Sequence, residues 1–145
     1  MANKITLDEA IDIHKMTINY SGGGTLGQLD TGKLDSVLQN IQNDDYYPSF
    51  AEKLTHLFFC ACEFHCFEDG NKRIAITLPL KLLIDNGYSH IAMTFLRVCE
   101  NITYHVAAGK IKKDLLLEII TAILNETYEY DEELKSKILT VIMEW

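Results

Sequence analysis

The sequence predicts an all-α, single-domain protein of six or seven helices, two of which enclose a polar loop in a helix-loop-helix. The 145 residues include only 8 glycines and 2 prolines, which favours long helices over a turn-rich β fold. Apolar residues recur at spacings of three and four along most of the chain, the period of amphipathic helices. Two capping boxes, Thr6–Glu9 and Ser49–Glu52, mark helix starts. The length suits one domain, residues 1–145, with a sizeable core.

The first helix is expected to begin at Thr6 and to end near Tyr20, because the glycines at 22–24 break helices. Residues 21–30 would form a loop, and Asp30 would cap a second helix. The apolar face of that second helix consists of Leu34, Val37, Leu38 and Ile41.

The clearest helix follows the connection 43–48 and opens at Ser49. Its apolar residues cover so much of its circumference that we expect it at the centre of the domain. They are Phe50, Leu54, Leu57, Phe58, Ala61 and Cys62. Tyr46 and Tyr47, just before it, are expected to cover the core.

A further apolar helix should run through residues 73–85 and stop at Asn86-Gly87, where glycine accepts a left-handed backbone. Pro79 cannot donate to the carbonyl of Ala75, so a kink or a break is expected there. Residues 89–93 would be a short extended connection.

The last part of the chain predicts three more helices, over residues 94–108, 113–125 and 132–144. Gly109 would end the first of them. The acidic stretch 128–135 is interpreted as a solvated connection and helix start.

The net charge of −8 argues against direct DNA binding, because neutralising phosphates requires surplus Lys and Arg. The N-terminus does not resemble a secretory signal and no apolar run reaches the length of a membrane span, so we expect a cytoplasmic protein. Reduced, buried thiols are expected rather than a metal site built from Cys60, Cys62, His65 and Cys66. His14, His56, His90 and His105 are interpreted as structural.

Residues 65–73, HCFEDGNKR, gather ionisable side chains between two apolar helices. Gly70, Asn71 and Lys72 fall where the second helix begins, so their backbone N–H groups are free to bind an anion. Lys72 and Arg73 add positive charges that can hold phosphate oxygens. This part of the packet predicts a phosphate site.

The two remaining ionisable side chains of the packet fit the same chemistry. Asp69 offers a hard oxygen ligand for Mg²⁺ beside the phosphate site. His65, at the end of the preceding helix, can take a proton from an attacking hydroxyl as general base. Together they predict phosphoryl or nucleotidyl transfer.

The pattern H-x-F-x-D-G-N-K-R over His65–Arg73 resembles the signature of the Fic/Doc superfamily, and most closely its death-on-curing (Doc) toxin branch. The helix that holds His14, with YSGGG and LDTGKLDS after it, extends the resemblance to residues 5–110. Residues 111–145 would be additional C-terminal helices.

The resemblance implies that ATP donates a phosphate-containing group to a Ser or Thr hydroxyl of a protein target, with Mg²⁺ as cofactor. His65 would be the general base, Asp69 the Mg²⁺ ligand, and Lys72 and Arg73 would be catalytic. Gly70, Asn71, Lys72 and Arg73 would bind the nucleotide phosphates.

Two departures from the AMP-transferring motif H-P-F-x-x-G-N-G-R-x-x-R bear on which group moves. Lys72 replaces its second glycine and Ile76 its last arginine. Both are shared with the Doc branch, whose members resemble kinases and modify translation proteins such as elongation factor Tu. Gly70 instead resembles AMP-transferring Fic enzymes, where Doc-like sequences often have Ala. We favour phosphate transfer, with AMP transfer as the alternative.

The family also implies that the enzyme is inhibited when it is not needed and that a flap holds its protein target. A separate small antitoxin is expected rather than self-inhibition through Thr140 and Glu144, since Trp145 follows instead of Gly or Asn. A flap that pairs with the target would lie in residues 21–30 or 43–48. A catalytically silent partner-binding module is a third reading, which the intact His65 disfavours.

Overall fold

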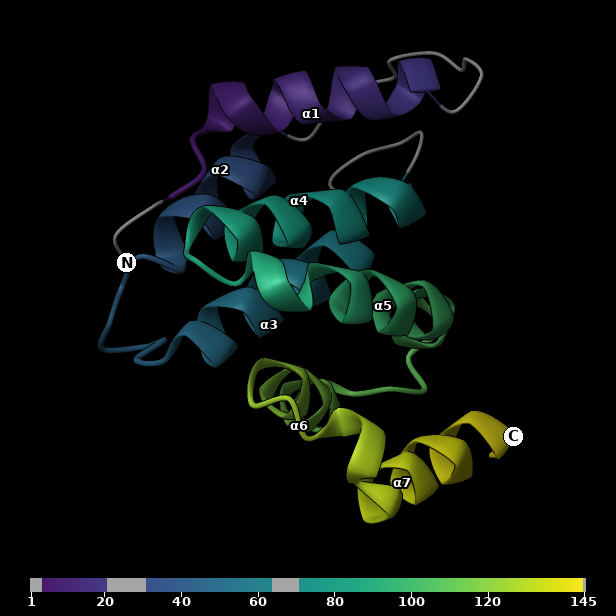
Figure 1. Cartoon of the computed structure of the whole chain (residues 1–145). Coiled ribbons are helices and arrows are strands. Elements are labelled where there is room, and N and C mark those ends of the chain that lie inside the picture. The colour runs from purple at the N-terminus through teal and green to yellow at the C-terminus, as the bar shows by residue number, and fades with distance from the viewer. Residues whose placement is uncertain (1–3, 21–30, 64–70, 145) are drawn as a thin grey trace.

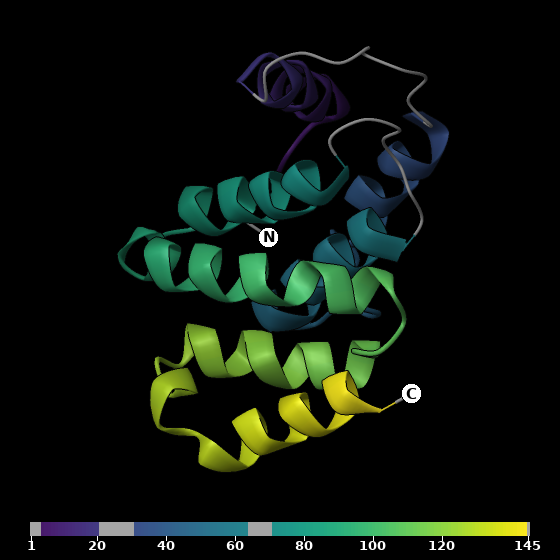
Figure 2. The same ribbon diagram turned by 90° about the vertical axis from the view of Figure 1, so that its right-hand side faces the viewer.

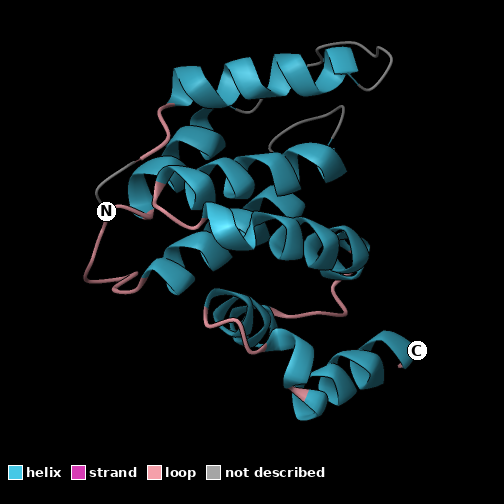
Figure 3. Ribbon diagram, in the orientation of Figure 1, coloured by secondary structure: helices cyan, strands magenta, loops and turns pink. Residues whose placement is uncertain are grey.

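The computed structural model describes residues 4–20, 31–63 and 71–144. Within these ranges the chain is helical and contains no strand, as Figure 3 shows, so the all-α prediction is confirmed. The α-helices are α1 (Leu7–Tyr20), α2 (Thr31–Asn40), α3 (Phe50–Glu63), α4 (Asn71–Asp85), α5 (Ala92–Ala107), α6 (Lys113–Leu124) and α7 (Glu132–Met143). Two short 3-10 helices, η1 (Ser89–Ile91) and η2 (Tyr128–Tyr130), precede α5 and α7.

Side chains cap the helix starts that the sequence indicated. The Thr6 Oγ1 accepts from the Glu9 N–H at 3.2 Å, and the Glu9 carboxylate accepts from the Thr6 N–H at 3.4 Å. The Ser49 Oγ accepts from the Glu52 N–H at 3.1 Å at the start of α3. Each bond pairs an amide that the helix itself leaves without a partner, which fixes where the helix begins.

Glycines end two helices in the left-handed conformation. Gly87 after α4 has φ 94° and Gly109 after α5 has φ 79°. Both stops were predicted from the sequence. A residue with a Cβ would be strained at either position.

Of the kink or break expected at Pro79, the break does not occur, because α4 runs without interruption from Asn71 to Asp85. A proline inside a helix costs about 3 kcal/mol. Leu78, Leu82 and Leu83 around it are fully buried, and each such side chain gains about 1.5–3 kcal/mol from burial. Packing on both sides of Pro79 therefore outweighs the missing hydrogen bond.

The extended connection expected at 89–93 is also wrong. Ser89–Ile91 form η1, and α5 already begins at Ala92. The Ile91 N–H donates to the Tyr88 carbonyl at 3.1 Å, and the Ile91 side chain is buried. The apolar contact of Ile91 with the core draws this turn into the following helix.

The helices form a stack around α3. Figures 1 and 2 show α1, α4, α5, α6 and α7 following one another down the molecule, while α2 lies beside the α3 side of the stack. The α3 helix packs against α2, α4, α5 and α6, which confirms its predicted central place. Its Leu54, Leu57 and Phe58 are almost completely buried.

The direction of the helices defines two ends of the molecule. The start of α1 lies against the later part of α4, where Glu9 approaches Lys81, so the two helices run antiparallel (Figure 1). The end of α3, the start of α4 and the end of α1 thus lie at one end, which we call the site end. The start of α3 lies at the opposite end.

Across the described ranges, every helix is too short or too polar to serve as a bilayer-crossing segment.

Candidate functional site

The packet 65–73 connects the two helices at the site end. The α3 helix ends at Glu63 and α4 begins at Asn71. Three of the predicted site residues, His65, Asp69 and Gly70, lie outside the described residues. The backbone of Asn71, Lys72 and Arg73 is described and forms the first turn of α4.

The start of α4 at Asn71 agrees with the sequence prediction of a helix N-terminus at this position. The first N–H groups of a helix have no carbonyl one turn earlier to donate to. They carry the positive end of the helix dipole, which favours a bound anion. The backbone of Asn71 and Lys72 therefore has the chemistry expected of a phosphate-binding turn.

An apolar base follows this turn. Ala75 and Leu78, in the following turns of α4, are completely buried, and α4 packs against α3. The α4 helix also packs against α1 and α5. The start of α4 is thus supported by the packing of the turns that follow its first turn.

Ile76 belongs to this base and not to the solvent-facing surface. Its side chain is only 9% exposed and packs within the core cluster. The position that carries the last arginine of the AMP-transferring motif is thus occupied by a core residue in this chain. A cation at position 76 would have to leave the core to reach a phosphate.

An ion-pair network fixes α1 against α4. The Lys81 ammonium lies 2.8 Å from the Asp85 carboxylate, one turn along α4, and 3.7 Å from the Glu9 carboxylate of α1. The hydrogen bond to Asp85 is the main cause that raises the pKa of Lys81. Since the Glu9 carboxylate also accepts from the Thr6 N–H, the start of α1 is bound both to its own backbone and to α4.

Of the two candidate flap segments, 43–48 lies away from the site end. It precedes α3, whose 14 residues extend about 20 Å at 1.5 Å per residue. It is also fixed, because the buried Lys53 ammonium donates to the Ile41 carbonyl at 2.8 Å and to the Asp44 carboxylate at 2.7 Å. The other candidate, 21–30, lies outside the described residues and follows Tyr20, which ends α1 at the site end.

His56 lies at the centre of a polar cluster that was not predicted from the sequence. Its Nδ1 accepts from the Lys113 ammonium at 2.7 Å, and the Tyr47 hydroxyl lies 3.2 Å from its Nε2. The Tyr47 ring stacks on the imidazole with centroids 4.5 Å apart, and the Cys60 Sγ lies 3.5 Å from Nε2. Burial, and then the charge of Lys113, lower the pKa of His56 to about 4.

These contacts give His56 the structural role that was predicted for it, linking α3, α6 and the connection before α3. The neighbouring tyrosines differ from each other. Tyr47 is half-buried against His56, whereas Tyr46 is 76% exposed, so the prediction that Tyr46 covers the core is wrong. The sequence carried no signal for the cluster, because Lys113 is 57 residues from His56.

The described cysteines are thiols buried in the core. Cys60, Cys62 and Cys99 are all buried, and burial raises the pKa of Cys99 well above its usual value. Among the described residues no group of His, Cys, Asp and Glu is arranged to hold a metal ion. His65 and Cys66, the other members of the metal site considered from the sequence, lie outside those residues.

Thr140 lies in α7 and Glu144 directly follows it, so both belong to the last layer of the stack, farthest from α1 (Figure 1). The Thr140 hydroxyl donates to the Ser136 carbonyl within α7, at 2.9 Å. The principal neighbour of α7 is α6, which separates it from α4 (Figure 2). This placement does not favour an inhibitory contact between α7 and the first turn of α4.

Comparison with known proteins gives one family. The sequence model of the Fic/DOC family matches residues 4–83. No curated protein and no solved structure matches the chain. The family match spans more than half of the 145 residues and runs from the start of α1 into α4, with the whole packet 65–73 inside it.

Proposed function

The chain belongs to the Fic/DOC family, and from that premise we propose that it transfers the γ-phosphate of a nucleoside triphosphate, such as ATP, to a protein hydroxyl. Members of this family are typically enzymes that transfer nucleotide-derived groups to proteins. The observation that carries the proposal is the start of α4 at Asn71. It gives the packet a helix N-terminus at which phosphates can bind.

In the proposed reaction His65 takes the proton of a Ser or Thr hydroxyl as that oxygen attacks the γ-phosphorus. The bond between the γ-phosphorus and the bridging oxygen breaks, and the nucleoside diphosphate leaves. Lys72 and Arg73 balance the negative charge that spreads over the phosphate oxygens. The N–H groups of Gly70 and Asn71 hold the phosphates in place, with Asn71 adding a side-chain amide.

The donor chemistry of the packet fits Mg²⁺. Asp69 supplies a carboxylate oxygen, the ligand type that Mg²⁺ prefers, two residues before the first turn of α4. When bound, the ion neutralises charge on the nucleotide phosphates. Asp69 is therefore proposed as the protein ligand of the metal.

Position 76 supports phosphate transfer over AMP transfer. The buried Ile76 supplies no cation to the distal phosphates of a nucleotide laid along the loop. Lys72 replaces the glycine that leaves room for the bridging phosphates in AMP-transferring Fic enzymes, which points the same way. AMP transfer is kept as the second candidate because Gly70 matches those enzymes rather than the Doc branch.

The protein target and the inhibitory partner are proposed from the Doc resemblance. A Ser or Thr of a translation factor such as elongation factor Tu is the proposed acceptor. A toxin of this kind would require a small antitoxin protein as partner. The placement of α7 away from α4 supports a separate restraint over self-inhibition.

The test incubates the protein with ATP, Mg²⁺ and purified elongation factor Tu or a bacterial lysate, and measures intact target masses. A gain of one phosphate supports the proposal, and a gain of one AMP overturns it in favour of the second candidate. His65→Ala should abolish transfer, and retained activity would remove His65 as the base. If no target gains mass and expression does not slow growth, a silent partner-binding module is the better reading.

A further inference from the structure

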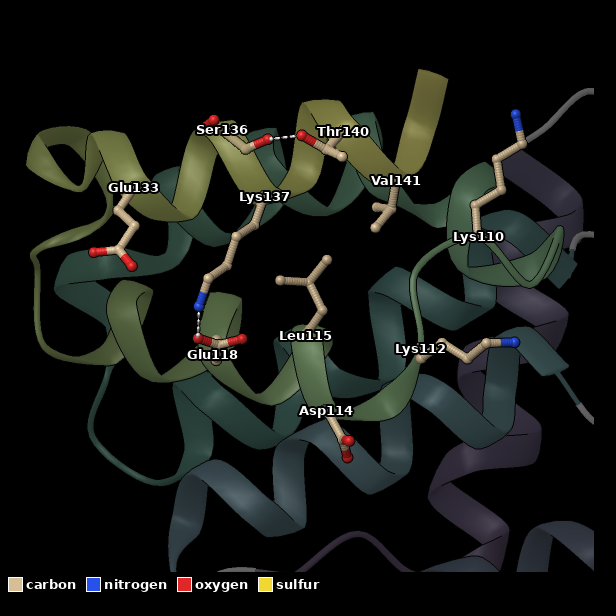
Figure 4. A pocket seen from close by; sticks show the side chains of 10 residues that line it. All are labelled: Lys110, Lys112, Asp114, Leu115, Glu118, Glu133, Ser136, Lys137, Thr140 and Val141. Carbon is tan, nitrogen blue, oxygen red and sulfur yellow. Dashed lines mark hydrogen bonds and ion pairs between the residues drawn. The ribbon is translucent and has the colours of Figure 1, made fainter. Parts of the chain in front are cut away.

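A groove of about 690 Å³ lies between α6 and α7, at the far end of the stack from α1 (Figure 4). Both helices lie outside the region matched by the family model, which ends at residue 83. The groove is lined by Lys110, Lys112, Asp114, Leu115, Glu118, Glu133, Ser136, Lys137, Thr140 and Val141.

The middle of the groove is apolar. Leu115 projects from α6 and Val141 from α7, and Figure 4 shows their side chains directed into the space between the helices. Both are only partly buried, although both pack against the core cluster. A small apolar side chain placed between them would remove exposed apolar surface from water.

The two ends of the groove carry opposite charges. Glu133, exposed on α7, lies at one end, and Lys110 and Lys112, which outnumber the nearby exposed Asp114, lie at the other (Figure 4). The Lys110 ammonium also donates to the Ile142 carbonyl at 2.9 Å, which leaves the exposed Lys112 as the more accessible cation. Between the ends, Lys137 of α7 pairs with Glu118 of α6 at 3.0 Å and holds the two walls together.

The dimensions suit a short helix. From Glu133 to Val141 the wall formed by α7 rises about 12 Å at 1.5 Å per residue, a little over two helical turns. A helix presents apolar side chains at spacings of three and four, which matches a narrow apolar floor between two helical walls. The positive N-terminal end of such a helix would meet Glu133, and its negative C-terminal end would meet Lys112.

We propose that this groove docks a short amphipathic helix of another protein, oriented with its N-terminus at Glu133 and its C-terminus at Lys112. The occupant carries one or two leucine-sized side chains that sit between Leu115 and Val141, basic residues in its first turn and acidic residues in its last. The interface is small, so binding is weak, in the micromolar range. The proposal does not depend on the transfer reaction, because none of these residues belongs to the proposed active site.

The test uses two hydrocarbon-stapled 12-residue peptides of equal helicity. The forward peptide has lysines in the first turn, leucines in the middle and glutamates in the last turn, and the reversed peptide exchanges the charged turns. Fluorescence anisotropy on the full chain at low salt should show the forward peptide binding at least about tenfold more tightly, since each end then gains or loses a favourable charge contact. Amide chemical-shift changes should concentrate in residues 110–118 and 133–141.

The matched control is the double variant Lys112→Glu with Glu133→Lys. It changes two exposed residues and keeps the apolar residues Leu115 and Val141 in the middle of the groove. It should invert the preference between the peptides, and Leu115→Lys should weaken both. Equal binding of the two peptides, no binding of either, or an unchanged preference in the charge-swapped variant would each overturn the proposal. Sedimentation that shows self-association through the same residues, with no displacement by the peptide, would assign the groove to a second copy of the chain instead.

Discussion

The ammonium of Lys113 donates a hydrogen bond to Nδ1 of His56 at 2.7 Å and thereby joins the first residue of α6 to the second turn of α3. The Lys113 Nζ also lies 5.5 Å from the centre of the Tyr47 ring and 5.7 Å from that of Phe59, where cation–π attraction adds to the bond. This bond requires a neutral imidazole as acceptor. The joint between α3 and α6 is therefore sensitive to the protonation of one histidine.

We expect the free energy of unfolding to fall as the pH is lowered from 6.5 towards 4. The pKa of His56 is about 4 in the folded protein and near 6.5 when unfolded, so between these values unfolding takes up a proton. The contribution of His56 is complete above pH 6.5 and is lost as the pH falls through its folded pKa. The expected loss is about 1–3 kcal/mol, measured by urea unfolding at several pH values.

His56→Gln separates this effect from general acid denaturation, because glutamine offers Lys113 an acceptor that does not titrate. Its stability should depend less on pH than that of the unchanged protein between pH 6.5 and 4. His90→Gln, at an exposed position in η1, is the matched control. An identical pH dependence in the His56 variant and the parent would contradict the expectation.

Lys53→Met should destabilise the protein by about 1–3 kcal/mol. Methionine keeps the buried stem but removes the ammonium that binds the Ile41 carbonyl and Asp44, which leaves a carbonyl without its partner. Thermal and urea unfolding would measure the loss, with Lys15→Met at an exposed position of α1 as the control. If both variants unfold alike, Lys53 does not stabilise the connection before α3.

Glu126→Gly should stabilise the protein by about 0.5–1 kcal/mol. Glu126 follows α6 with φ 59°, a left-handed conformation in which a side chain is strained and glycine is not. Gly109→Ala makes the opposite change after α5, at φ 79° with no atom within 4 Å of the added Cβ, and should destabilise through the backbone alone. Unfolding curves in which the two changes have the same sign would rule out backbone strain as the cause.

Ile76→Arg should lower stability by about 3 kcal/mol or more and should not increase AMP transfer. The position is 9% exposed, so the guanidinium would be buried without a partner or would push α4 away from α3. Ile84→Arg, at a 44% exposed position of the same helix, is the control and should be tolerated. A folded Ile76→Arg protein that attaches AMP faster than the parent would show that position 76 faces the nucleotide.

Local signals in the sequence predicted most of the fold. The capping boxes at Thr6 and Ser49 and the glycines at 87 and 109 fixed helix ends because each acts through its own neighbouring backbone. The break at Pro79 and the extended connection at residues 89–93, which do not occur, were expectations of the opposite character. At these two places the secondary structure depends on burial against residues that are distant in the sequence, and a local sequence pattern does not contain that information.

The sequence predicted the motif of the candidate site, but it did not predict the packing around that motif. The start of α4 at Asn71 follows from the residues around it, whereas the burial of Ile76 depends on how α4 packs in the core. Lys53 and Lys113 resemble ordinary surface lysines in the sequence. Their partners lie 12 and 57 residues away, so only the folded chain brings them together.

The boundary of the family match does not coincide with a boundary in the core. The match ends at residue 83, inside α4, yet Phe95 of α5 and Ile119 and Ile120 of α6 are completely buried, and α6 covers one side of α3. A fragment cut at residue 83 would expose that side of its central helix to water and would aggregate or remain unfolded. The chain can be dissected by substitution, but the half that carries the family match cannot be obtained by truncation.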